Sequence, residues 1–273
     1  MISFVYLSNR YGSIDLLADS LLKQTDAPDY ELVVVDGCKG RVERGAVFRY
    51  FQSLKVTKDH LGWYGKPHPK SFDWSRTGFS AAMNTGIIHS RGEWIVFLHD
   101  FSMLVPTALK QWEDALLASD KKTLIHGSAF FYKADKPTGF HDIQTWEGAR
   151  SVDCTEHWIP KEFDLGYWGA PTDYFLDSNG IDERSDFCAT WATASVVAQA
   201  KHLGYALKVE PTLLCHMIDH RKWSDDMIGD SQYKTMGIFS DIPEEPIWTS
   251  WAANPFLLYL EREKYIWSRN EGK

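Results

Sequence analysis

The order of the apolar segments predicts an α/β protein with a mixed, mainly parallel sheet flanked by helices. Residues 2–7 (ISFVYL) and 31–37 (ELVVVDG) have the short, β-branched character of buried strands, and a helical pattern lies between them. A strand, a helix and a strand in about 35 residues form a βαβ unit, whose crossover makes its strands parallel. The same alternation continues between residues 79 and 211.

The first helix is expected to begin near Ser13, a residue type that caps helices. Its apolar residues, Ile14, Leu17, Leu21 and Leu22, would share one face. A third strand is expected near residues 54–57.

The later elements follow the same reasoning, and Pro106 is expected to open a helix that ends near Ser119. We expect helices at 79–89 and 190–203, strands at 93–100, 123–133 and 205–211, and an aromatic-rich loop over 134–180.

Two units are expected along the chain. Residues 1–224 would form the α/β domain, and residues 225–273 a mainly helical appendage packed on it, with an amphipathic pattern over 245–268.

The composition narrows the class of protein. The chain has 273 residues, of which 44% are hydrophobic and 24% charged, a globular mixture. A net charge of −8 argues against a general nucleic-acid binder. The four cysteines form no CxxC pair, which argues against a zinc site or a disulfide framework. No leader peptide or transmembrane segment is recognised, so we expect a cytoplasmic protein.

Three predicted strands end on polar residues, namely Ser8-Asn9-Arg10, Asp36-Gly37 and His99-Asp100. In open α/β sheets, ligands bind at the carboxyl ends of the strands. The chain has no GxGxxG and no GxxxxGK[ST] phosphate loop. A nucleotide site here would therefore neutralise a diphosphate by other means, such as a divalent cation held by a carboxylate.

Over about residues 1–222 the chain resembles the GT-A glycosyltransferases, and within them the family-2-like enzymes. The pieces come in the family's order: SFVYLSNRYGSIDLLADSLLKQ, ELVVVDG, SAAMNTGIIHSRGEWIVFLHD, NGIDERSD and LGYALKVEPTLLCH. The resemblance implies a GT-A, Rossmann-like fold and a hexosyltransferase that uses a nucleotide-diphospho-sugar, with a UDP-sugar preferred.

The resemblance also implies a metal site. FLHD stands where the family has its DXD motif, so Asp100 would bind Mn²⁺ or Mg²⁺ that bridges the two phosphates. His99 would replace the first acid and face the ribose or the ion. His216 is the preferred third ligand over His220, with a structural role as its alternative.

The remaining donor contacts are also implied by the resemblance. Asp36 would read the nucleotide base. The other expected donor-site residues are Ser8, Asn9, Arg10, Lys70, Arg76 and Asn84.

An inverting transferase needs a base that deprotonates the acceptor hydroxyl. The family usually carries an acidic pair here, but residues 187–195 (FCATWATAS) contain no acid. We expect Asp186 to be the base, with Asp182 and Glu183 nearby; a turn or capping role is the alternative.

The acceptor side is expected in the aromatic segment, where Trp158, Tyr167 and Trp168 could stack on sugar rings. Core packing is the alternative for each.

Two other functions remain open. The chain could glycosylate a hydroxylated nucleic-acid base, using a basic patch of Arg41, Arg44, Arg49, Lys55 and Lys58. It could also be a degenerate, non-catalytic carbohydrate-binding protein that keeps the GT-A fold.

Overall fold

The computed structural model describes residues 1–8, 13–36, 56–58, 79–99, 102–133, 154–158, 163, 165–181 and 189–219. The expected appendage at 225–273 lies outside these ranges.

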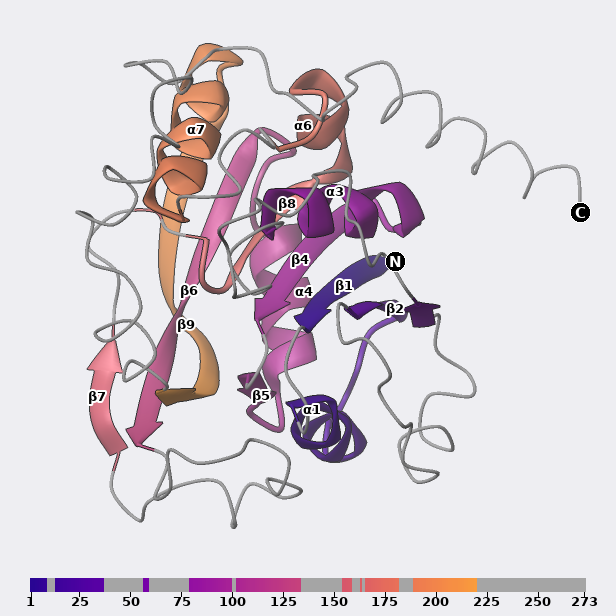
Figure 1. Ribbon diagram of the computed structural model, residues 1–273, viewed down its shortest axis with the longest axis vertical. Helices are drawn as coiled ribbons and strands as arrows, with labels where there is room; N and C mark the ends of the chain where they lie inside the picture. The colour runs from indigo at the N-terminus through magenta and orange to yellow at the C-terminus, as the bar shows by residue number, and fades with distance from the viewer. Residues whose placement is uncertain are drawn as a thin grey trace, which may run out of the picture.

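Nine strands and five helices are interspersed along the described residues (Figure 1). The strands are β1 (Ile2–Ser8), β2 (Tyr30–Asp36), β3 (Val56–Lys58), β4 (Trp94–His99), β5 (Ser102–Leu104), β6 (Thr123–Lys133), β7 (Cys154–Trp158), β8 (Trp168–Pro171) and β9 (Ala206–Asp219). The helices are α1 (Ser13–Leu22), α3 (Phe79–His89), α4 (Ala108–Leu117), α6 (Thr172–Asp177) and α7 (Ala189–His202).

The described strands form one nine-stranded sheet in the order β3-β2-β1-β4-β8-β6-β9-β5, with β7 paired to β6. Strands β3, β2, β1 and β4 run parallel to one another, and β6 runs parallel to β9. Strand β8 is antiparallel to both β4 and β6, and β5 is antiparallel to β9. The predicted mixed, mainly parallel sheet is therefore confirmed.

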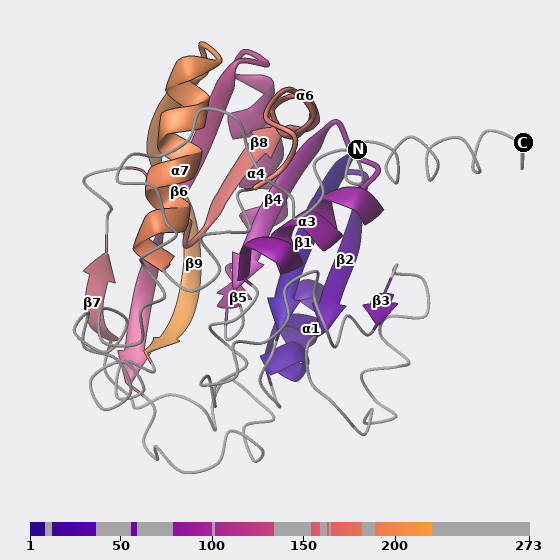
Figure 2. The same ribbon diagram turned by 45° about the horizontal axis from the view of Figure 1, so that its top comes forward.

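The two faces of the sheet carry separate layers of the core, because successive side chains of a strand point to opposite faces. In β1, Phe4 and Tyr6 pack with Leu17 of α1, whereas Val5 packs on the opposite face with Met83 of α3. Figure 2 shows α3 and α7 on one side of the sheet and α1 and α4 on the other.

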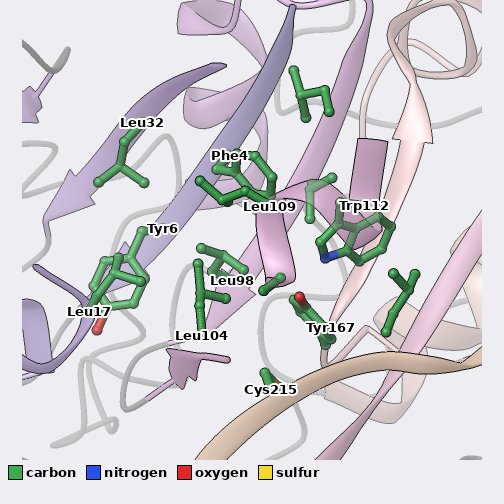
Figure 3. Close-up of a cluster of buried hydrophobic side chains, with 14 of the residues drawn as sticks. Phe4, Tyr6, Leu17, Leu32, Leu98, Leu104, Leu109, Trp112, Tyr167 and Cys215 are labelled. Carbon is green, nitrogen blue, oxygen red and sulfur yellow. The ribbon is translucent and has the colours of Figure 1, made fainter. Parts of the chain in front are cut away.

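The cluster between the sheet and the helices α1 and α4 is rich in large side chains (Figure 3). Trp112 of α4 is completely buried there and meets the edge of Tyr167, with ring centroids 5.2 Å apart and an interplanar angle of 87°. Such edge-to-face pairs add to the stabilisation that area burial gives.

Most expected elements agree with the structure to within a few residues, and β9 extends beyond the expected 205–211. Two expectations are wrong. Residues 134–180 are not all loop, because they contain β7, β8 and α6. Leu22 does not share the buried face of α1, since 57% of its surface is exposed.

Within the described ranges, no helix has the length and apolar character needed to cross a bilayer.

Candidate active site

The carboxyl ends of four neighbouring strands meet at one edge of the sheet. Ser8 at the end of β1 pairs with Asp36 at the end of β2, and Asp36 pairs with Lys58 at the end of β3. On the other side of β1, Leu7 pairs with His99, the last residue of β4. The strand registers thus bring Ser8, Asp36 and His99, which the sequence predicted separately, to one edge.

Lys58 is a residue of this edge that the sequence reasoning assigned to a different role. The sequence places Lys58 only in a possible basic patch for nucleic acid, whereas its backbone lies next to Asp36 in the sheet. The strand expected near residues 54–57 ends directly before Lys58, and this spacing could have identified Lys58 as a strand-end residue. The other members of that patch, Arg41, Arg44, Arg49 and Lys55, lie outside the described residues.

His99 is half-buried, and its ring is held by the backbone. Its Nε2 lies 2.6 Å from the carbonyl oxygen of Leu165, which precedes β8. A carbonyl oxygen can only accept, so Nε2 carries the proton and donates. In the neutral ring the metal-binding lone pair is then on Nδ1. Metal-ligating histidines commonly donate their other N–H to a carbonyl in this way, so the ring fits a metal ligand.

Asn84 lies within helix α3, and its side-chain amide binds the backbone of Ile181. It is 1% exposed on α3, its Nδ2 donates to the carbonyl of Ile181 at 2.9 Å, and its Oδ1 accepts from the Ile181 N–H at 2.7 Å. The amide therefore serves to join α3 to the end of the α6 region. Its expected role as a donor-binding residue stays a prediction.

Gly86, which with Asn84 and Thr85 makes up the Asn-Thr-Gly sequence of α3 (the N-x-G motif), has a packing role. A Cβ placed on Gly86 would lie 2.3 Å from Cγ1 of Val5 in β1. No two non-bonded carbon atoms tolerate that distance, so glycine lets α3 lie directly on the sheet. The motif thus fixes the helix in two ways, through the glycine contact and through the Asn84 amide.

Tyr167 and Trp168 are core residues, which corrects their expected role at the acceptor surface. They are 1% and 0% exposed. Trp168 stacks on Phe97 of β4 with centroids 5.1 Å apart and rings inclined by 23°. A buried ring has no face to offer a sugar. The third expected acceptor residue, Trp158, pairs with Ala129 at the edge strand β7, and its role stays a prediction.

Burial also argues against two groups as general bases. It raises the pKa of the Tyr167 phenol well above its ordinary value, and it raises the pKa of the Cys215 thiol. Both groups therefore stay protonated at neutral pH.

His216 lies on β9, where it pairs with Met103 of β5, three residues beyond Asp100 in the sequence. Its ring stacks on Phe130 of β6 with centroids 5.7 Å apart and rings inclined by 25°. Stacking fixes the ring plane, which suits a ligand as well as a structural histidine, so the metal role stays a prediction.

Several expected site residues lie outside the described ranges, and their roles also stay predictions. They are the donor residues Asn9, Arg10, Lys70 and Arg76, the metal ligand Asp100, and the acids Asp182, Glu183 and Asp186.

Two solved structures have a similar fold. The mannosyltransferase PcManGT from Pyrobaculum calidifontis, in complex with GDP-Man and Mn²⁺, has a TM-score of 0.50 and 17% identity over 79% of this chain and 56% of that chain. S. aureus TarS 1–349, in complex with UDP, has a TM-score of 0.52 and 16% identity over 89% of this chain and 67% of that chain. The chain thus spans little more than half the length of the mannosyltransferase.

No curated protein has significant sequence similarity to this chain. The sequence model described as "Glycosyl transferase family 2" matches residues 5–143, slightly more than half of the chain. With the sheet order and the polar edge described above, this match shows that the chain belongs to glycosyl transferase family 2, whose members are glycosyltransferases of the GT-A fold.

Proposed function

We propose that this glycosyltransferase moves a hexosyl group from a nucleotide-diphospho-sugar, with a UDP-sugar preferred, to an acceptor hydroxyl, with a divalent metal and with inversion. The observation that carries the proposal is the common edge formed by Ser8, Asp36 and His99. This edge would offer the nucleotide a site at the strand ends, although the chain has no phosphate loop.

The donor would lie along this edge. Asp36 would accept hydrogen bonds from the nucleotide base, and Ser8, Asn9 and Arg10 would contact the nucleotide from the end of β1. Lys70 and Arg76 would meet the phosphates, because arginine can bind phosphate oxygens in a bidentate manner.

Asp100, His99 through Nδ1, and His216 would hold Mn²⁺ or Mg²⁺. Mn²⁺ suits a shell of imidazole and carboxylate better than Mg²⁺ does. The metal would neutralise charge on the two phosphates as the diphosphate leaves.

The transfer step needs one base. The acceptor oxygen would form a bond to the anomeric carbon as the bond from that carbon to the diphosphate breaks. Asp186, or its neighbours Asp182 and Glu183, would take the hydroxyl proton. A single displacement of this kind inverts the anomeric configuration.

The proposal is tested by melting temperature, with UDP, GDP, UDP-glucose and GDP-mannose, each with and without Mn²⁺. A ligand that binds only the folded state raises the melting temperature. We expect a metal-dependent rise that is lost in Asp100→Ala and reduced in Asp36→Asn.

Asp29→Asn provides the matched control. Asp29 is an exposed acid next to the amino end of β2, whereas Asp36 lies at the carboxyl end of the same strand. We expect Asp29→Asn to behave as the wild type. No rise with any ligand, or an equal loss in both β2 variants, would contradict a donor site at this edge.

A further inference from the structure

A cluster of hydrogen bonds joins three segments at the amino edge of the sheet, opposite the candidate site. Ser3 of β1 and Glu31 of β2 are neighbours in the strand register, and both are buried. The Ser3 hydroxyl donates to Oε1 of Glu31 at 2.6 Å. Both oxygens also accept from the turn before β4. The Gly92 N–H donates to Ser3 Oγ at 2.7 Å, and the Arg91 N–H donates to Ser3 Oγ at 3.0 Å and also to Glu31 Oε1. We call Ser3, Glu31, Arg91 and Gly92 the amino-edge cluster.

Gly92 lies directly against the backbone of β1. A Cβ on Gly92 would lie 2.6 Å from the Ser3 nitrogen and 2.8 Å from the Met1 carbonyl oxygen, so only glycine allows this approach. Thr172, the residue after β8, holds the same turn through its hydroxyl, which donates to the Gly92 carbonyl at 2.7 Å. Strand β4 therefore begins at a fixed point beside β1.

The apolar residues of β4 are by themselves a weak guide to its register. Residues 94–98 of β4 and 4–7 of β1 are all apolar and buried. A shift of β4 that put Phe97 opposite Leu7 would keep every side chain on its own face, and it would still place only apolar residues opposite 4–7. Such a shift would separate the amino-edge cluster and leave buried N–H and oxygen groups without partners, which is costly. The cluster therefore distinguishes the observed register from the shifted one.

The register decides where His99 lies at the other end of β4. In the observed register His99 is opposite Leu7, and its Nε2 donates to the Leu165 carbonyl at 2.6 Å. A shift by two residues would move His99 by roughly 6.6 Å along the strand. No hydrogen bond spans such a displacement, so the bond to Leu165 depends on the register.

We propose that Ser3 and Glu31 are positioning residues, which set the register of β4 from the amino edge of the sheet and thereby place His99 at the carboxyl edge. The inference concerns the placement of His99. Its consequence for metal binding rests on the proposed function, so the test below uses neither metal nor nucleotide.

The test uses four variants of the full chain. Ser3→Ala removes the hydroxyl that both N–H groups share, and Glu31→Leu removes the carboxylate but keeps an apolar stem of similar size. Glu31→Gln is the conservative variant, because its amide oxygen can accept the same two hydrogen bonds. Ser178→Ala is the matched control, since Ser178 is also buried and its hydroxyl donates to the Gly180 carbonyl at 3.1 Å, outside the cluster.

Two signals of His99 are measured by NMR, and stability is measured by denaturant unfolding. The first signal is the Nε2-bound proton of His99, identified by its loss in His99→Gln. It is visible only while its bond to Leu165 protects it from exchange with water. The second signal is the nuclear Overhauser contact between the backbones of Leu7 and His99, which reports the register directly.

We expect Ser3→Ala and Glu31→Leu to lose both signals under conditions in which the protein is folded. Glu31→Gln should keep both signals, as should Ser178→Ala, even if each has a lower unfolding midpoint than the wild type. This pattern separates positioning from stability, because a loss of stability alone would not move a signal of the folded state at the far end of the strand.

The inference would be overturned if Ser3→Ala and Glu31→Leu were less stable but kept both signals, because the cluster would then stabilise the fold without setting the register. Loss of both signals in Ser178→Ala would also overturn it, since any buried hydroxyl would then have the same effect. If Glu31→Leu did not fold, Ser3→Ala, which removes a single oxygen atom, would decide alone. A wild type that shows both signals but binds no nucleotide would contradict only the proposed function.

Discussion

The Nε2 atom of His99 donates to the carbonyl oxygen of Leu165 at 2.6 Å, and this bond joins the end of β4 to the segment before β8. It lies where two parts of the sheet meet, since β4 and β8 pair directly, with Phe97 opposite Trp168. The bond therefore holds the chain at the strand end and also fixes Nε2 as the nitrogen of His99 that carries the proton.

Replacing His99 should separate these two roles. We expect His99→Ala to cost about 1 kcal/mol in the free energy of unfolding, the usual contribution of one hydrogen bond. It should also abolish the Mn²⁺-dependent part of the UDP-induced rise in melting temperature. Denaturant unfolding and melting with UDP, with and without Mn²⁺, measure the two effects.

His99→Gln is the informative companion variant, because its amide can still donate to Leu165 but offers no imidazole. We expect stability to return toward the wild type while the Mn²⁺ effect stays absent. A glutamine variant with the full Mn²⁺ effect would show that His99 is structural only.

Gly86 gives a prediction about the N-x-G motif. We expect Gly86→Ala to destabilise the protein by about 1–3 kcal/mol, the usual cost of overpacking, because its Cβ would lie 2.3 Å from Val5 Cγ1. Urea unfolding measures the change. Gly204→Ala is the control: Gly204 has φ 76° but nothing within 4 Å, so its cost is backbone strain without a clash.

The double variant Val5→Ala/Gly86→Ala tests the mechanism of this loss. Removing the valine methyl groups should relieve the clash, so the double variant should be more stable than the sum of the two single changes predicts. Strict additivity of the two changes would contradict direct contact between α3 and β1 at this point.

The strands of the sheet could be predicted from the sequence because their signal is local. The apolar runs ISFVYL, ELVVVD and WIVFLH are continuous, as expected for strands covered on both faces, and each became a strand. Their polar ends followed from the same pattern. The convergence of Ser8, Asp36 and His99 then needed only the rule that parallel strands end at one edge.

The roles of Asn84, Tyr167 and Trp168 could not be read from local signals. The partner of Asn84 is 97 residues away in the sequence, and neither residue type predicts such a contact. Trp168 lies in a segment without strand periodicity, and only its pairing with β4 and β6 makes it a core residue. The roles of these residues are therefore set by tertiary packing.

Trp168 offers a test of its place in the core. We expect Trp168→Ala to cost about 3–5 kcal/mol, as for other buried aromatic side chains, and Trp168→Phe to cost clearly less because the ring contacts with Phe97 and Phe175 persist in part. Urea unfolding gives both values.

The outcome for binding is the second half of this test. Folded Trp168→Phe should bind UDP with Mn²⁺ as the wild type does. If Trp168→Ala were as stable as the wild type but no longer transferred the sugar to an acceptor, Trp168 would be an acceptor-binding residue and not a core residue.

Cys215 makes stability depend on alkaline pH. It is completely buried, its Sγ lies 3.7 Å from the Ser128 carbonyl oxygen, and burial raises the pKa of its thiol. An unfolded cysteine loses its proton near pH 8.5, whereas the folded protein keeps it. The folded state therefore binds more protons, and its stability must fall as the pH rises above about 8.5.

We expect the free energy of unfolding of the wild type to fall, relative to Cys215→Ala, by about 1.4 kcal/mol for each pH unit above that point. Denaturant unfolding of both proteins between pH 7 and pH 10 measures the difference, and the comparison cancels every other titrating group. Below about pH 8 the difference should be constant and should reflect only the packing of the thiol. A constant difference up to pH 10, or rapid alkylation of Cys215 in the folded protein at pH 8, would contradict a thiol held protonated in the core.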